Sequence, residues 1–257
     1  MSHENEYHGS MIKMLELIWG EGYMAPGGPG NVAKLLRGLE TRNKRILDIG
    51  CGIGGPALEM ARTHEAEVVG IDLEAPLIER ATNAAVDRGL ADRCSFRRID
   101  AGALPFADQS FDIVVTSGAI TQTENKPEIF AECFRVLNPD GHLTSYEWMK
   151  SSEPYSDDMH YWFKMEGLTY ALETLDEYRI HLAGCGFVDI DVQDSSSWYR
   201  IEVEREYDLM KGELYPRMVE LMGRKDADHF VENWRAMAIV CRQGEMRQGY
   251  SRGRKPA

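Results

Sequence analysis

Three acidic residues stand where predicted β-strands end in the first half of the chain. Asp48 lies within LDIGCGIGG at residues 47–55, Asp72 closes the next strand, and Asp100 closes the third. The glycines allow a sharp turn and let a ligand approach the backbone closely. Carboxylates at such strand ends accept hydrogen bonds from ribose hydroxyls and from an adenine amino group. The spacing therefore predicts a nucleoside-binding site.

The glycine stretch is compatible with two kinds of cofactor. Gly50, Gly52 and Gly55 satisfy the GxGxxG pattern of dinucleotide folds, which alone is a weak signal. Asp48, two residues before the first glycine, would repel a pyrophosphate but suits a cationic group. S-adenosylmethionine (SAM) has a ribose, an adenine, an amino group and a sulfonium, and it has no phosphate. We therefore expect SAM as the cofactor and S-adenosylhomocysteine (SAH) as its product.

Alternating strands and helices must position these residues. Strands are expected at 45–50, 66–73, 95–100, 111–118 and 142–148, with helices at 54–62, 76–89 and 127–137 between them. This alternation predicts an α/β fold with a doubly wound, Rossmann-like sheet, whose ligand lies at the carboxyl ends of the strands. After an aromatic and acidic interruption, a helix at 174–186 and a strand at 187–193 resume the pattern.

The flanking segments predict helical cap insertions on this sheet. Residues 11–19 are apolar at helical spacing, 25–30 (APGGPG) predict a loop, and 198–240 have a helical pattern. The basic, glycine-rich end from residue 242 is interpreted as a solvated tail. We expect three parts: an N-terminal helical lid at 1–40, a SAM-binding core at 41–148, and a C-terminal part at 149–257 that holds the cap insert, the remaining strands and the last helices.

The composition is that of an ordinary globular protein and excludes several kinds of partner. The 257 residues carry a formal net charge of −13, which disfavours binding to nucleic acid or to an anionic membrane. With no run of 18 apolar residues and no signal peptide, we expect a cytoplasmic protein. The five cysteines form no CxxC and the histidines form no HExxH, so we expect no metal site.

The ordered motifs resemble those of the class I SAM-dependent methyltransferases: DIGCGIGG, GIDL, RIDAGALPF, FDIVV and RVLNPDGHL. A narrower resemblance, to the phosphoethanolamine and sarcosine/dimethylglycine N-methyltransferases, rests on EYHGSMIKMLELIWGEGYMAPGG and EMRQGYSRG near the two ends. It implies that the N-terminal helix and its tyrosines close over the cofactor. The cofactor-binding residues that it implies are Tyr7, Met24, Ala25, Asp48, Gly50, Gly52, Asp72, Leu73, Asp100, Ala101 and Ser117.

The loop after the fourth predicted strand departs from that family. The family reads roughly Asp-Ala-Ile-x-His, whereas GAITQ places Gly118 at the acid and Gln122 at the histidine. The pair that orients and deprotonates the substrate in the phosphoethanolamine enzymes is therefore missing. An arginine that would bind the substrate phosphate is also replaced, near Leu168. These departures argue against phosphoethanolamine as the substrate.

Polar and aromatic residues near the strand ends and in the insert are candidates for contact with a methyl acceptor. The catalytic candidates are Tyr7, Gln122 and Glu147, and the substrate-binding candidates are Tyr23, Gln122, Glu147, Trp148, Trp162 and Tyr170. A carboxylate beside aromatic faces suits a cationic or zwitterionic substrate. The aromatic residues of the insert are also compatible with the core of a small helical cap.

A site without a base fits a nucleophile that arrives without a proton to lose. Methyl transfer is a direct displacement, and the protein mainly supplies proximity and alignment. We expect a SAM-dependent methyltransferase that acts on a small soluble acceptor, by N-methylation of an amine or an amino acid derivative. Two alternatives stay open. One is S-methylation of a small thioether such as methionine or a related acid, and the other is a non-catalytic SAM-binding regulatory protein.

Overall fold

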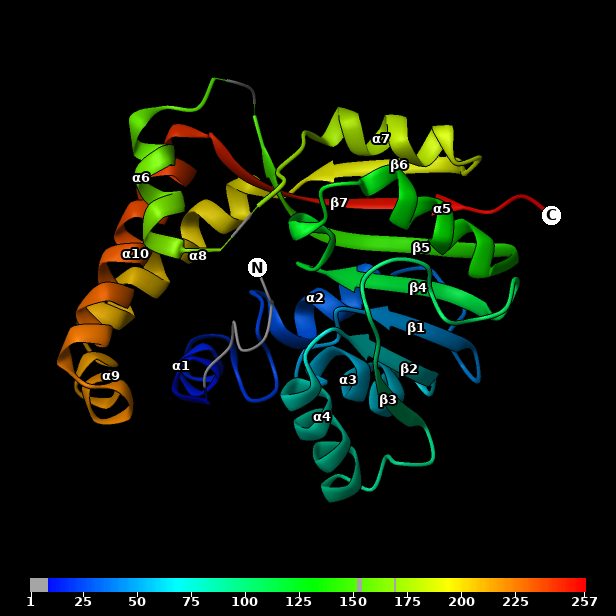
Figure 1. Ribbon diagram of the computed structural model, residues 1–257, viewed down its shortest axis with the longest axis horizontal. Helices are drawn as coiled ribbons and strands as arrows, with labels where there is room; N and C mark the ends of the chain where they lie inside the picture. Colours follow the sequence, from blue (N-terminus) through cyan, green and yellow to red (C-terminus); the bar gives the residue numbers. More distant parts are fainter. Residues whose placement is uncertain (1–8, 152–153, 169) are drawn as a thin grey trace.

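The computed structural model describes residues 9–151, 154–168 and 170–257, and its centre is a seven-stranded mixed sheet (Figure 1). The strands are β1 (Arg45–Ile49), β2 (Glu67–Asp72), β3 (Cys94–Arg98), β4 (Phe111–Ser117), β5 (Leu137–Lys150), β6 (Val188–Asp194) and β7 (Met246–Arg254). Their order is β3-β2-β1-β4-β5-β7-β6. Strands β1 to β5 pair in parallel, and β7 is antiparallel to β5 and β6. The predicted doubly wound α/β sheet is confirmed.

Helices cover both faces of the sheet. They are α1 (Gly9–Trp19), α2 (Gly28–Leu35), α3 (Gly55–His64), α4 (Ala75–Asp87), α5 (Lys126–Val136), α6 (Asp157–Glu166), α7 (Leu175–Gly184), α8 (Ser196–Lys211), α9 (Tyr215–Met222) and α10 (Arg224–Gln243). Ile46 shares a buried cluster with Leu58 of α3, whereas its neighbour Leu47 shares another with Phe130 of α5. Central parallel strands are buried on both faces in this way, which leaves their carboxyl ends for the site.

Prolines account for where several of these helices begin. Pro56, Pro76 and Pro127 lie in the first turns of α3, α4 and α5, where the missing N–H has no helical partner to lose. The loop expected at 25–30 ends earlier than predicted, because α2 begins at Gly28 and also has a proline in its first turn. Gly27, at φ 100°, makes the left-handed turn before it. None of the helices within the described ranges has both the length and the apolar character needed to cross a membrane.

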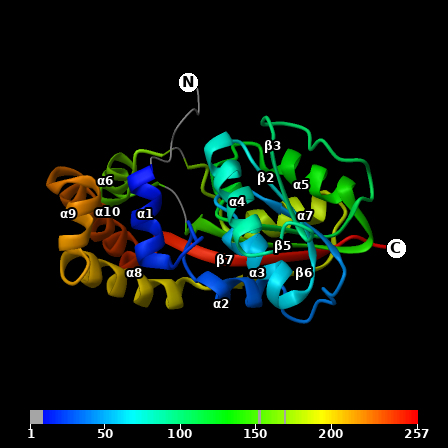
Figure 2. The ribbon, with the colours of Figure 1, turned by 90° about the horizontal axis from the view of Figure 1, so that it is seen from below.

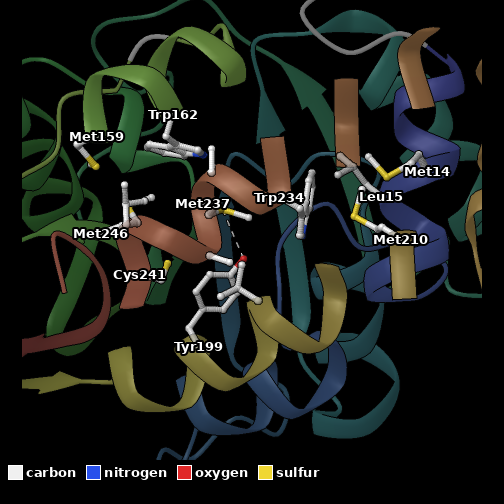
Figure 3. Close-up of a cluster of buried hydrophobic side chains, with 14 of the residues drawn as sticks. Met14, Leu15, Met159, Trp162, Tyr199, Met210, Trp234, Met237, Cys241 and Met246 are labelled. Carbon is white, nitrogen blue, oxygen red and sulfur yellow. Dashed lines mark hydrogen bonds between the residues drawn. The ribbon is translucent and has the colours of Figure 1, made fainter. Parts of the chain in front are cut away.

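A second layer of helices forms the predicted cap beside the sheet (Figure 2). Helix α10 contacts α6, α8 and α9, and α1 contacts α9. Their common core includes Met14 of α1, Trp162 of α6, Tyr199 of α8 and Trp234 of α10 (Figure 3). Between α6 and α8, the chain returns to the sheet to form α7 and β6. The cap is therefore assembled from both ends of the chain.

The basic end of the chain is a strand, so its interpretation as a solvated tail is wrong. Strand β7 lies between β5 and β6. Its glycines are required by packing, because a Cβ atom at Gly249 would lie 2.6 Å from Leu175 Cδ2. The Arg252 guanidinium donates to the carbonyl oxygens of Leu35 and Arg37. Glycines and arginines replace the apolar alternation that usually marks a strand, and this hid β7 in the sequence.

Candidate active site

A cavity of about 870 Å³ lies where the carboxyl edge of the sheet meets the cap. Its lining falls into two groups, which we name the cofactor half and the acceptor half. The cofactor half comprises Met24, Ala25, Asp48, Gly50, Gly52, Asp72, Leu73, Asp100, Ala101 and Ser117. The acceptor half comprises Gln122, Trp148, Trp162, Glu166, Tyr170, Asn233 and Trp234. The sheet thus provides the cofactor half, and the cap provides most of the acceptor half.

The glycine stretch forms a tight turn directly after β1. Gly50 and Gly52 have φ of 68° and 53°, in the left-handed region that favours glycine. The Gly50 N–H donates to the carbonyl oxygen of Ile71, which ties the turn to β2. A Cβ atom at Gly50 would lie 2.2 Å from that of Ala119. A larger residue at Gly50 would therefore displace the loop that follows β4.

Asp48 is a buried carboxylate with one unpaired oxygen. Its side chain lies at the base of the cofactor half with 2% of its surface exposed, and Oδ2 has no hydrogen-bond partner in the described residues. Burial, assisted by the charge of Asp72, raises the pKa of Asp48 to about 8. A cationic ligand group nearby would favour the ionised form and lower that pKa. The carboxylate is therefore suited to a cation, as its position in the sequence predicted.

The other two strand-end acids differ in how firmly they are held. Asp72 Oδ2 accepts from the Gly52 N–H (3.0 Å) and Oδ1 from the Glu74 N–H (3.0 Å), which fixes the carboxylate at the cavity wall. Burial raises the pKa of Asp72, and these hydrogen bonds oppose the rise. Asp100 lines the cavity too, but its side chain is 81% exposed and pairs with Arg98 at 2.8 Å. Asp72 is thus the preorganised acid of the pair.

The segment after α1 docks on the glycine turn. The Gly55 N–H donates to the carbonyl oxygen of Gly22 (3.0 Å), and a Cβ atom at Gly55 would lie 2.1 Å from that oxygen. This contact brings Met24 and Ala25 onto the cofactor half. Tyr23 also lines the cavity, but its ring is mostly buried in the core of α2 and α3, away from the acceptor half. Tyr7 lies outside the described residues, so its role stays a prediction.

Helix α1 is fastened to the cap through a buried carboxylate. Glu206 of α8 accepts from Trp19 Nε1 at 2.8 Å and from Trp234 Nε1 at 3.0 Å. Burial raises the pKa of Glu206 to about 7. Both indoles line the cavity. On the other side, Glu16 of α1 pairs with Arg80 of α4 at 3.1 Å. The helix therefore bridges the cap and the sheet above the cavity.

Glu147 does not reach the acceptor, so its assignment as a catalytic and substrate-binding residue is wrong. It is 1% exposed and does not line the cavity. Its carboxylate accepts from Thr116 Oγ1 (2.9 Å) and from the N–H and Oγ1 of Thr121 (3.0 and 2.8 Å). The strand that was expected to end at 148 continues to Lys150, which places Glu147 inside the sheet.

The network around Glu147 positions the loop that carries Gln122. Thr121 belongs to the short helix η1 (Ile120–Gln122), and its backbone oxygen accepts from the Ala171 N–H of the insert (3.0 Å). Gln122 lines the cavity at the end of that helix. Trp148, the residue after Glu147, points the opposite way along the strand and also lines the cavity. The loop is therefore rigidly placed although its acid–histidine pair is missing.

Aromatic rings form the wall of the acceptor half. Trp162 and Tyr170 are stacked with 5.3 Å between ring centroids and 19° between planes. Trp148 packs edge-on against Tyr199 at 4.8 Å. Trp162 belongs to the core cluster of the cap and also lines the cavity. Trp162 therefore belongs both to the core of the cap and to the wall of the cavity.

Two polar residues of the acceptor half were missed by the sequence analysis. Glu166 ends α6, and its carboxylate accepts hydrogen bonds from Tyr170 Oη (2.8 Å) and from Asn233 Nδ2 of α10. Asn233 is 4% exposed, and its Oδ1 has no partner in the described residues. No motif marks either residue, because they are 67 positions apart and meet only through the packing of α6 on α10.

The observed groups of the cofactor half fit SAM. The unpaired Asp48 oxygen suits a cationic amino group, and the firmly held Asp72 suits ribose hydroxyls. Gly52 lets a ligand approach the turn, since a Cβ atom there would already lie 3.1 Å from Met24 Sδ. Leu73 and Ala101 give apolar walls for a base. The carboxylate of Asp48 lies beside the turn in addition to that of Asp72, and it is unfavourable for a pyrophosphate. A dinucleotide therefore fits less well than SAM.

Comparison with known proteins agrees with this geometry. Residues 47–145 match the family model described as a methyltransferase domain. Phosphoethanolamine N-methyltransferase 1 of Arabidopsis thaliana is 27% identical over 95% of this chain and 49% of its own length. The structure of phosphoethanolamine N-methyltransferase 2 of Haemonchus contortus superposes with a TM-score of 0.90 at 22% identity, covering 98% of this chain and 59% of that one. A putative sarcosine dimethylglycine methyltransferase from Galdieria sulphuraria gives 0.78 at 22% identity, over 89% and 85%.

The chain has the fold of the class I methyltransferases, and its residues 47–145 match a methyltransferase domain. Within that class, phosphoethanolamine N-methyltransferases are relatives that match nearly the whole chain. The chain spans about half the length of these curated relatives.

Proposed function

We propose that the chain is a SAM-dependent methyltransferase that N-methylates a small soluble amine. The observation that carries this proposal is the pairing of two environments in one cavity. Buried or firmly held carboxylates flank the glycine turn, and aromatic faces with a carboxylate lie opposite. The first environment suits a cationic nucleoside, and the second suits an amine.

In this proposal each half of the cavity has a separate task. When bound, SAM supplies a methyl group already activated by its sulfonium. Asp48 and Asp72 hold the amino and ribose ends, and the Gly50–Gly55 turn lies against the cofactor. Gln122 and Trp148 orient the acceptor, whose neutral nitrogen donates its lone pair to the methyl carbon. Bound SAM would supply the methyl group and would leave as SAH, and the proton of the amine would pass to water before or after the transfer.

The protein's main contribution in this reaction is alignment. Positioning two reactants can account for several kcal/mol of a barrier, on the order of 7–11 kcal/mol in well-oriented cases. The buried network of Glu147 and Thr121 supports this role, because it fixes η1, in which Ile120, Thr121 and Gln122 have no side chain that titrates near neutral pH. The rings of Trp19 and Trp234 cover the cavity from the cap side and restrict its access to water.

S-methylation of a small thioether is the second candidate, and one observation favours it. The loop between β4 and α5 presents Gly118 and Gln122 to the cavity, and neither side chain can take a proton near neutral pH. A thioether has no proton to lose. The pH dependence of turnover separates the two candidates, because only an amine acceptor shows a limb set by its own deprotonation.

A screen with isotopically labelled SAM tests the proposed reaction. The full chain is incubated with SAM carrying a trideuterated methyl group and with separate sets of small amines and thioethers. We expect the label in an amine, with one SAH formed for each methyl group transferred. Label only in a thioether would select the second candidate. SAH binding without label in any acceptor of either set would favour the regulatory protein.

A further inference from the structure

The charge of the cavity lining restricts the acceptor further than its shape does. Eight carboxylate side chains line the cavity, and among the described lining residues there is no lysine or arginine. Two of these carboxylates, Asp100 and Glu132, are paired with arginines that lie outside the lining. Among the described lining residues, His229 is the one side chain that can become cationic. The carboxylates of this lining disfavour a phosphate or a carboxylate on the acceptor, which, unlike SAM, brings no sulfonium to offset the negative charge.

Within the acceptor half, Glu166 and Asn233 form a site that accepts hydrogen bonds. Both Glu166 oxygens already accept bonds, one from Tyr170 and one from Asn233, so the carboxylate is held in one orientation. The Asn233 amide must turn its nitrogen to that carboxylate, because two facing oxygens would repel. This leaves Oδ1 of a 96% buried side chain without a partner, which is costly unless a ligand donates to it.

The chemistry of methyl transfer decides which ligand group this site receives. The nitrogen or sulfur that attacks the methyl carbon must be uncharged and must present a free lone pair. A charged group on Glu166 therefore cannot be the reacting atom in the productive complex. The Glu166 carboxylate calls for a second, cationic group with N–H donors, and the stacked faces of Trp162 and Tyr170 beside it also favour a cation.

We infer that the acceptor is a cationic compound of the diamine type. One ammonium group binds Glu166 and Asn233, the other nitrogen (or a thioether sulfur) is methylated, and no phosphate or carboxylate is present. This inference rests on the proposed function, because it assigns the acceptor half of the same cavity. It excludes phosphoethanolamine and simple amino acids as efficient acceptors.

Calorimetry on the full chain, saturated with SAH, tests the inference with a graded set of probes. The probes are 1,3-diaminopropane, 1,4-diaminobutane, 1,5-diaminopentane, butylamine, 4-aminobutyrate and O-phosphoethanolamine. At least one diamine should bind up to about tenfold more tightly than butylamine, because its second nitrogen adds a hydrogen bond that butylamine cannot make. The two anionic probes should bind more weakly than butylamine. Tighter binding of either anionic probe, or no preference for any diamine, overturns the inference.

A pair of variants on one helix locates the binding of the ammonium group. Glu166→Gln keeps the size of the side chain, removes its charge and should weaken the binding of both the diamines and butylamine by about tenfold, because the ammonium group of either probe can bind Glu166. Asp157→Asn removes the same charge from the exposed start of α6, outside the cavity, and should leave both affinities unchanged. Equal losses in both variants would contradict the assignment.

SAH binding separates failure of this inference from failure of the proposed function. It is measured first, in the wild type and in both variants, and it also reports whether they are folded. If the wild type does not bind SAH, the proposed function and the inference both fall. If SAH binds and the order of the probes is reversed, the inference alone fails, and the probe series in the wild type decides this without any variant.

Discussion

The cofactor half and the acceptor half of the cavity are built in different ways. The cofactor half comes from turns that directly follow β1, β2 and β3 and from the end of β4, so its residues stand in or next to recognisable motifs. The acceptor half takes one residue each from η1 and β5, two each from α6 and α10, and Tyr170 from the segment after α6, and its wall depends on how the cap helices pack. The cofactor half is therefore encoded by local sequence, and the acceptor half by tertiary contacts.

The two halves also differ in how their polar groups are satisfied. In the cofactor half, Asp72 is fixed by backbone N–H groups of the turns themselves. In the acceptor half, Glu166 is fixed by side chains from a loop and from another helix. Substitutions in the cap can therefore change the acceptor without disturbing the cofactor. The following predictions, from the largest expected effect on turnover to the smallest, test that independence.

Deleting residues 1–20 should abolish turnover, because α1 is the element that touches both halves. The deletion removes Trp19, which bonds Glu206 in the cap, and Met14 from the cap core. The sheet should keep its circular dichroism signal, whereas the cap should lose near-ultraviolet signal from its tryptophans. Lys13→Ala, on the exposed side of α1, serves as the control and should retain full turnover. Full turnover in the truncated chain would show that the halves work without this bridge.

Gln122→Ala should slow turnover by about 10–1000-fold, as loss of alignment does, and should leave SAH affinity unchanged. Gln122 lies in the acceptor half and orients without titrating, so the pH profile should keep the shape of the wild type. The measurement is kcat against pH for both proteins. A lost limb in the pH profile of the variant would mean that this loop takes part in proton transfer after all.

Asp72→Ala should weaken SAH binding by about 1–3 kcal/mol, or roughly 5–150-fold, because it removes a held polar contact and frees two backbone N–H groups. At saturating SAM the order of acceptor preference should be unchanged. Calorimetry gives the affinity, and Asp87→Ala, on the exposed face of α4, is the matched control. A change in acceptor preference would mean that the two halves are coupled.

Glu206→Gln should change the pH dependence of stability more than turnover. Burial raises the pKa of Glu206 from 4.5 to about 7, so in that window the folded state holds a proton that the unfolded state has released. The stability that this protonated group contributes is complete below pH 4.5 and is lost as the pH rises through about 7.

Denaturant unfolding of both proteins at several pH values checks this prediction. Between pH 5 and 8 the wild type should lose up to about 3 kcal/mol relative to the variant, since other titrating groups are common to both. Parallel stability curves would show that Glu206 does not titrate in this range.

The sequence predicted the sheet well, and it marked the turns that line the cofactor half, because both signals are short-range. The glycine stretch, Asp48 and Asp72 each follow an apolar strand closely, and the turn geometry follows from glycine itself. Glu147 was placed at the end of its strand, whereas β5 continues two residues beyond the expected end at 148. Strand β7 was missed because packing against Leu175 and Phe187 demands glycines where a strand normally shows alternation. Glu166 and Asn233 have no local signal at all.

The central claim is that this cavity binds SAM in a half built for a cationic nucleoside. Calorimetry of the full chain with SAH and, separately, with NAD tests it most directly. We predict that one SAH binds per chain and that NAD does not bind, because the buried carboxylate of Asp48 lies beside the glycine turn where a pyrophosphate would lie. Tight binding of NAD with no binding of SAH would contradict the account.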